Sequence, residues 1–242
     1  SKGKNYKLLL HHSMVDSSKL PPTSTAGVFL ALSLALFATR RIQTPAKNYS
    51  NKKPHLLPTN PQKRAYETFV LKYSALWMAI FTAVVVSGVY EAFGALEYNA
   101  LCAVLALPLL LSPWLAEPAP SGRRRPLPLA RRHSTRAQLW IALFSFIGNY
   151  WYTHYFYSVL RARYTMEATR LHGVPVCMYF ATHFYFSSYH VFANLALRWI
   201  CSSYAAGPRR FALLAVAVAF MSYATAFMET LTISHFPYYD FE

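Results

Sequence analysis

Long apolar stretches separated by short polar segments run through the whole chain. Six of them are candidates for helices, at residues 23–39, 68–90, 94–115, 137–160, 174–197 and 211–233. A helix needs roughly 20 residues to cross the apolar core of a bilayer, and only helices or closed barrels satisfy the backbone there. Because none of the stretches alternates with a period of two, the pattern predicts an all-α fold, a polytopic transmembrane helix bundle.

The same pattern divides the chain into two regions. Residues 60–242 hold the five longer stretches, which we interpret as core spans, and residues 1–59 form an N-terminal extension with one short apolar membrane segment. That segment, at 23–39, is short for a span, so a helix lying in the membrane interface is an alternative for it.

Composition and charge agree with a membrane bundle. The chain is 55% hydrophobic and 14% charged, whereas a soluble domain carries about 25% charge. The net charge is +15, and 16 of the 24 lysine and arginine residues lie in the loops 40–66, 116–136 and 198–210. Alternating spans place these loops on one side of the membrane, where they match anionic phospholipid headgroups. This distribution argues against a nucleic-acid partner.

Polar side chains form a stripe along the fifth stretch. His183, Ser187, His190 and Asn194 are spaced at i, i+4, i+7 and i+11, which places them on one face of a helix. Polar groups at membrane depth are expensive, so this face should point into the bundle. Two interpretations stay open: a functional site, or hydrogen bonds between helices that only hold the bundle together.

The fourth stretch carries a similar face. Tyr150, His154 and Tyr157 follow the spacing i, i+4, i+7, and the short loop to the fifth stretch predicts that the two helices are antiparallel neighbours. Their polar faces are then able to meet. Tyrosines also gather at membrane interfaces, an alternative that suits Tyr152 and Tyr155 better than His154.

The sixth stretch contains an acid, Glu229, with Thr225 one turn before it. An apolar setting disfavours the charged form of a carboxyl, which makes it a candidate proton donor. The alternative is an ordinary glutamate close to the membrane boundary.

The histidines do not predict a metal site. His183 and His190 are separated by seven residues, whereas ligands from one helix to one ion normally lie at i, i+3 or i+4. Axial haem ligation by His154 together with His183 or His190 is compatible with the spacing but not required by it. We therefore predict no metal and no cofactor.

Several segments of the chain, in order, resemble one enzyme family. They are NPQKRAYETFVLKYSALW (60–77), YEAFGALEY (90–98), GNYWYTHYF (148–156), ATHFYFSSYHVFAN (181–194) and SHFPYYDF (234–241). Together they resemble the cycloeucalenol cycloisomerases, also called cyclopropyl sterol isomerases. The resemblance covers 60–242.

The resemblance implies a membrane enzyme of sterol biosynthesis without cofactor or metal. Such an enzyme opens the 9β,19-cyclopropane ring of a 4α-methyl sterol, as in the conversion of cycloeucalenol to obtusifoliol, by protonation and deprotonation. Among the polar positions of the spans, our candidates for proton transfer are Glu229, His154, His183 and His190. The candidates for substrate binding are Tyr150, Tyr157, Ser187, Asn194 and Thr225.

Two features set the chain apart from the family pattern. Residues 1–59 lie outside the resemblance, and Val176 stands where the family pattern has a histidine. A second interpretation is therefore a non-catalytic accessory subunit of a larger membrane complex, with other subunits and anionic lipid as partners. The enzyme would reside in the endoplasmic reticulum, and the accessory subunit in the mitochondrial inner membrane or another organelle.

Overall fold

The computed structural model describes residues 54–115, 119, 127–159, 161–234 and 237–241, together with 27, 30, 33, 34, 37 and 38; at 229–234, 239 and 241 only the backbone is described. The predicted N-terminal extension therefore lies almost entirely outside the described residues. The chain divides into two compact units. The larger unit comprises residues 54–199 and 237–242, and the smaller comprises 1–53 and 200–236.

The first core helix of the larger unit is α3, Pro61–Ser87. The side chain of Asn60 caps it by accepting hydrogen bonds from two backbone amides of the first turn, at 3.0 and 3.1 Å. Pro61 occupies the first helical position, where its missing amide hydrogen is not needed. The helix ends at Gly88, which has φ 68°, a conformation that glycine adopts without strain. The cap explains why the helix begins before the apolar stretch at 68.

A short 3₁₀ turn, η2 (Val89–Ala92), leads into α4, Ala95–Leu110. The one-turn helix α5, Ser112–Leu115, continues it after a break at Leu111. Pro108 and Pro113 flank this break, and proline lacks the amide hydrogen that a continuous helix uses. The phenol of Tyr73 on α3 donates a 2.7 Å hydrogen bond to the Leu105 carbonyl, which joins α3 to α4.

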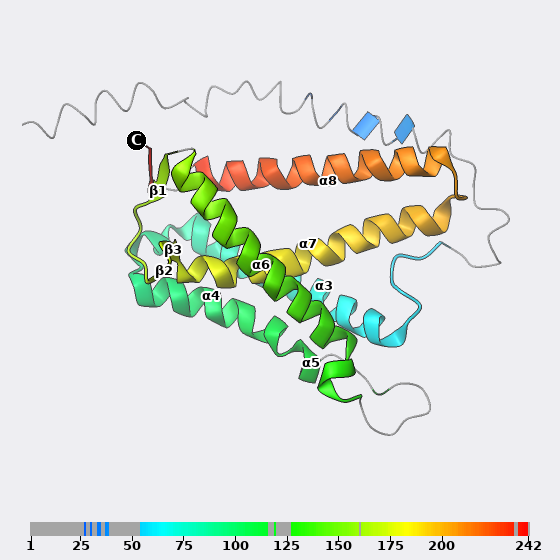
Figure 1. Ribbon diagram of the computed structural model, residues 1–242, viewed down its shortest axis with the longest axis horizontal. Coiled ribbons are helices and arrows are strands. Elements are labelled where there is room, and N and C mark those ends of the chain that lie inside the picture. Colours follow the sequence, from blue (N-terminus) through cyan, green and yellow to red (C-terminus); the bar gives the residue numbers. More distant parts are fainter. Residues whose placement is uncertain are drawn as a thin grey trace, which may run out of the picture. The chain divides into compact units, whose positions relative to one another are not determined.

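The fourth and fifth predicted spans appear as long helices. After the 3₁₀ turn η3 (Leu129–Arg131), α6 covers His133–Ser158 and α7 covers Val176–Ser203. Figure 1 shows α6 crossing α7, and ring contacts join them: Phe144 lies 5.3 Å from Phe186, and Phe146 lies 4.9 Å from Tyr179, between centroids. The predicted neighbourhood of these helices is therefore confirmed.

The connection between α6 and α7 contains short strands, which the periodicity did not indicate. Strands β2 (Arg170–Leu171) and β3 (Val174–Pro175) form an antiparallel hairpin. Its two-residue turn, His172 and Gly173, has φ values of 50° and 81°, the type I′ geometry that matches the twist of a hairpin.

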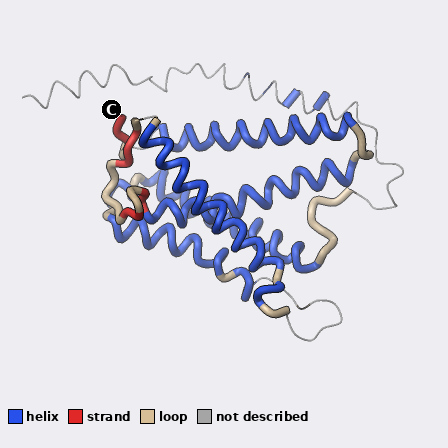
Figure 2. The backbone as a smooth tube through the Cα atoms, in the orientation of Figure 1, coloured by secondary structure: helices blue, strands red, loops and turns tan. Residues whose placement is uncertain are grey.

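The end of the chain returns to this connection. Strand β4 (Tyr239–Phe241) pairs antiparallel with β1 (Ala162–Tyr164). The phenol of Tyr238 donates a 2.9 Å hydrogen bond to the carbonyl of Glu91, in the turn between α3 and α4. Figure 2 shows the strands, in red, gathered at one end of the larger unit. Residues 238–241 therefore have a structural role, because they connect the end of the chain to two loops.

In the smaller unit, helix α8 covers Pro208–Ser234. The guanidinium of Arg210 donates to the Tyr204 carbonyl at 3.2 Å, which fixes the turn that precedes α8.

Three described helices are long and apolar enough to cross a membrane: Pro61–Ser87, Ala95–Leu115 and Pro208–Met228. Large apolar side chains on α3 are exposed, among them Leu76 and Val86, as expected for a surface in contact with lipid. We conclude that the chain is a mostly helical integral membrane protein. Helices α6 and α7 are long enough to span but more polar, so the full count of five core spans and an N-terminal helix stays a prediction.

Candidate functional site

A chain of buried hydrogen bonds joins three helices in the larger unit. His183 Nε2 on α7 lies 2.7 Å from Gln138 Oε1 on α6, and Gln138 Nε2 donates at 3.0 Å to the phenol oxygen of Tyr66 on α3. All three residues are at most 5% exposed. With the amide in this orientation, His183 Nε2 carries the hydrogen, and in the neutral ring Nδ1 keeps a lone pair. The ring is thus able to accept a proton at Nδ1.

A buried ion pair lies next to this chain of hydrogen bonds. Glu67, adjacent to Tyr66, is 1% exposed and accepts two hydrogen bonds from Arg198, at 2.7 and 2.8 Å. Such a bidentate pair has fixed geometry. The ammonium of Lys63 lies 3.8 Å from the same carboxylate, and Arg198 also donates to the Leu56 carbonyl. This pair connects the start of α3 to the second half of α7.

Closer to the middle of α3, Ser188 forms a second polar junction between helices. Its hydroxyl oxygen lies 2.7 Å from Ser74 Oγ and accepts from Trp77 Nε1 at 2.9 Å. The Trp77 ring lies 4.7 Å from Phe184, between centroids. Because the polar groups of this junction bond one another, we interpret it as a contact that holds the two helices together.

Aromatic side chains gather where α6 and α7 approach the hairpin. The His154 ring lies 4.5 Å from Tyr150 and 6.2 Å from Tyr157, between centroids, and Tyr150 lies 6.3 Å from His172. Tyr179 on α7 lies near the two α6 tyrosines. We call these five side chains the aromatic cluster.

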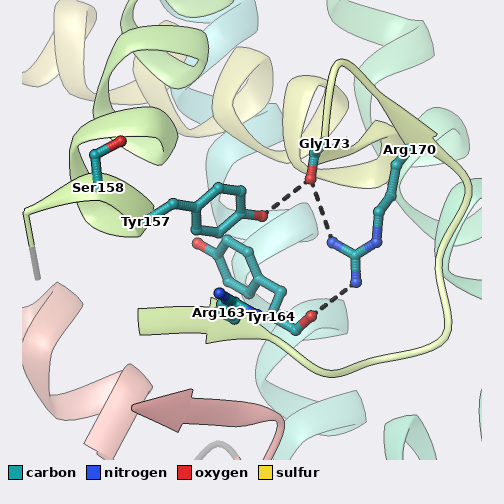
Figure 3. A pocket seen from close by; sticks show the side chains of 6 residues that line it. All are labelled: Tyr157, Ser158, Arg163, Tyr164, Arg170 and Gly173. Carbon is teal, nitrogen blue, oxygen red and sulfur yellow. Dashed lines mark hydrogen bonds between the residues drawn. The ribbon is translucent and has the colours of Figure 1, made fainter. Parts of the chain in front are cut away.

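A pocket of about 270 Å³ opens beside the aromatic cluster. Figure 3 shows its lining: Tyr157, Ser158, Arg163, Tyr164, Arg170 and Gly173. The Tyr157 phenol donates to the Gly173 carbonyl at 3.0 Å, and Arg170 donates to the Tyr164 carbonyl at 2.7 Å. These bonds fix the wall of the pocket. Ligand pockets typically measure about 300–1,000 Å³, so this one has room for only part of a sterol.

The predicted stripe on α7 is divided among different surroundings. His183 is bonded to Gln138, and Ser187 is fully buried, with no hydrogen bond to its oxygen among the described residues. His190 is half-buried and interacts electrostatically with Lys63 and Glu67. Asn194 is half-buried.

The other predicted site residues fall into two groups. Tyr150, His154 and Tyr157 come together in the aromatic cluster, as their spacing predicted. Thr225 and Glu229 lie on α8 in the smaller unit, and the side chain of Glu229 lies outside the described residues. The roles assigned to all of these residues stay predictions.

Within the described part of the chain, no group of three or more His, Cys, Asp or Glu side chains is arranged to hold a metal ion. The polar groups found here are suited to hydrogen bonding and proton transfer.

Sequence reasoning missed the partners that complete the buried network: Tyr66, Glu67, Gln138 and Arg198. Glu67 and Tyr66 precede the apolar stretch that begins at 68, so the hydropathy boundary placed them outside the span. Gln138 is the sixth residue of α6 and follows a polar first turn. A usable signal existed: glutamate and glutamine beside long apolar runs need a partner if they are buried.

Comparison with known proteins gives one informative match. No protein-family model and no solved structure matches the chain. The chain is 38% identical over 188 residues to a protein of Arabidopsis thaliana named cycloeucalenol cycloisomerase, and the match covers 76% of this chain and 66% of that protein. The chain thus spans just under two thirds of the length of that relative. The resemblance seen in the motifs is thereby confirmed, and the chain is a family-level relative of cycloeucalenol cycloisomerase.

Proposed function

We propose that this chain is a sterol isomerase that opens the 9β,19-cyclopropane ring of a 4α-methyl sterol and leaves a Δ8 double bond. The observation that carries the proposal is the 38% identity to the cycloeucalenol cycloisomerase of Arabidopsis thaliana over 188 residues. A system of buried polar groups inside an apolar bundle, centred on His183 and Gln138, supports it, because the reaction needs proton transfer away from water.

The reaction balances without any co-reactant. A general acid delivers a proton to C19, and the C9–C19 bond supplies the electrons, so that a methyl group forms on C10 and a cation develops at C9. A base then removes the proton from C8, and the electrons of that C–H bond form the double bond between C8 and C9. After one turnover the acid has lost a proton and the base has gained one. Transfer of a proton from the base back to the acid, directly or through solvent, restores the starting state of the enzyme.

We assign the base to the α7 histidines and the acid to a carboxyl. His183 is suited to the base role because its Nε2 is bonded to Gln138, which leaves Nδ1 to accept a proton. Glu229 is our acid, since an acid within an apolar helix favours its neutral form. The aromatic side chains of α6 and α7 present ring faces that are able to stabilise the developing cation.

The test is conversion of cycloeucalenol by the purified chain in detergent or liposomes, followed by gas chromatography and mass spectrometry. We expect a Δ8 sterol of unchanged mass, formed by the wild type and lost in Glu229→Gln. Ser222→Ala, on the same helix, should keep activity. A folded protein that forms no product, while the Arabidopsis enzyme converts the same sample, would overturn the proposal.

The bonding of the polar groups favours one second candidate, an accessory subunit of a larger membrane complex. His183 and Ser188 are hydrogen-bonded between helices, as structural polar groups are. In this case the chain should migrate with other proteins on a native gel after mild detergent extraction and should bind anionic lipid at its basic loops. Migration of the chain alone would count against this candidate.

A further inference from the structure

Three polar atoms near the hairpin end of α6 and α7 make no hydrogen bond within the described part of the chain, although they are buried. They are His154 Nε2, Tyr179 Oη and Asn149 Nδ2. Asn149 is 8% exposed, and its other amide atom already accepts from Thr153 at 3.2 Å. A buried polar atom left without a partner is costly, because it has lost its hydrogen bonds to water. A ligand that satisfied these atoms would recover much of that cost.

The histidine and the tyrosine both belong to the aromatic cluster and share Tyr150 and Tyr157 as neighbours. The His154 ring lies between Tyr150 and Tyr157, at 4.5 and 6.2 Å between centroids. Tyr179 lies near the same two tyrosines, and its ring stacks on Phe146 at 4.9 Å between centroids. The cluster is otherwise a set of ring faces and edges, which is an apolar surface that accepts a flat hydrocarbon ring system.

The chemistry of the unpartnered atoms is that of an alcohol site. A neutral imidazole nitrogen accepts a hydrogen bond, an amide nitrogen donates one, and a phenol does either. An alcohol has one hydrogen to donate and lone pairs to accept. A carboxylate or phosphate has no hydrogen to offer to His154, so the set fits a hydroxyl better than an anion.

The position of the cluster fits a ligand with a polar head and an apolar body. Tyr157 belongs both to the cluster and to the lining of the pocket of about 270 Å³ in Figure 3. That volume falls below the roughly 300–1,000 Å³ of pockets that enclose whole ligands, so it has room for only one end of a longer molecule. The cluster adjoins the hairpin, because Tyr157 donates to the carbonyl of Gly173 in its turn.

We propose that His154 and Tyr179 bind the 3-hydroxyl of the sterol and so fix the depth at which its rings lie between α6 and α7. This inference rests on the sterol substrate of the proposed function and adds to it. It makes His154 a binding residue and leaves proton transfer to the α7 histidines and Glu229.

The test measures binding, so it does not depend on turnover. A tritiated 9β,19-cyclopropyl sterol and its 3-methyl ether are each titrated against the full chain in detergent micelles. The ether keeps the oxygen but has no hydrogen to donate, and it adds a methyl group at the same place. We expect the free alcohol to bind roughly 3- to 10-fold more tightly, the effect of one hydrogen bond.

Variants test which residues form hydrogen bonds with the hydroxyl. Tyr179→Phe removes only an oxygen and should abolish most of the preference for the alcohol, as should His154→Phe. If His154→Phe does not fold, His154→Gln, which keeps a hydrogen-bonding group, should retain part of the preference. Tyr152→Phe is the matched control, because Tyr152 lies on the same helix and is 71% exposed; its preference should equal that of the wild type.

Two outcomes separate this inference from the proposed function. Equal binding of alcohol and ether by the wild type, or an unchanged preference in Tyr179→Phe and His154→Phe, overturns the inference even if the chain isomerises sterols. A preference that is lost in these variants upholds the inference even if the chain shows no isomerase activity.

Discussion

At the scale of single residues, a buried carboxylate determines much of the local energetics. Glu67 is 1% exposed and has a two-point contact with Arg198. Two charges taken out of the solvent cost several kcal/mol each unless they are paired, so removal of one partner should harm more than removal of both.

The first prediction concerns this ion pair. Arg198→Met should lower the free energy of unfolding by about 3–5 kcal/mol, because the Glu67 carboxylate is left buried without its partner. Thermal unfolding in detergent measures the change. The double variant with Glu67→Met in addition should recover most of the loss. Lys63→Met is the control, since its 3.8 Å contact is partly exposed and should be worth less than about 1 kcal/mol. A double variant as unstable as the single one would contradict this view.

The second prediction concerns the bond between His183 and Gln138. Gln138→Leu removes the acceptor of the histidine hydrogen, so the ring is free to turn and its Nδ1 loses its orientation. If His183 is the base, the catalytic rate should fall by about 10²-fold, a typical general-base contribution, whereas the KM for sterol should change little. Steady-state kinetics with Gln138→Leu and with Ser188→Ala, which lies one helical turn farther along α7, makes the comparison. Equal rates in both variants would remove His183 from the proton path.

At the scale of elements, hydropathy predicted the helices well and the long-range partners poorly. The caps of α3 at Asn60 and Gly88 are local signals that the sequence carries. The pairing of Glu67 with Arg198 joins residues 131 positions apart, and β1 pairs with the far end of the chain. Such contacts depend on how the helices pack, and no periodicity encodes them. The polar faces of α6 and α7 were predictable because spacing along one helix determines them. Their bonding partners were not, because these depend on how the helices pack.

The third prediction concerns the hairpin between α6 and α7. Gly173 has φ 81°, and its carbonyl accepts from Tyr157. Gly173→Ala should strain the turn by about 1 kcal/mol or more and speed hydrogen exchange in residues 170–175. Gly207→Ala is the control, since a Cβ at that position meets nothing within 4 Å and the backbone is unstrained. Unchanged exchange in Gly173→Ala would contradict the turn geometry.

At the scale of the whole molecule, the larger unit provides a histidine with an oriented ring, an aromatic cluster with unpartnered polar atoms, and a pocket beside it. The histidine is bonded across α6 and α7, whereas the cluster and the pocket lie at the end of α6 and the connection that follows it. The acid that we propose, Glu229, lies on α8 in the smaller unit.

The central claim is that this protein opens a cyclopropane ring by protonating C19. The most direct measurement is isomerisation of cycloeucalenol in D₂O, with the product analysed by mass spectrometry and deuterium NMR. We predict a Δ8 sterol with one deuterium in the new methyl group on C10, because the acid exchanges its proton with solvent between turnovers. A folded protein that yields no Δ8 sterol, or one whose product methyl carries no deuterium, would contradict the account.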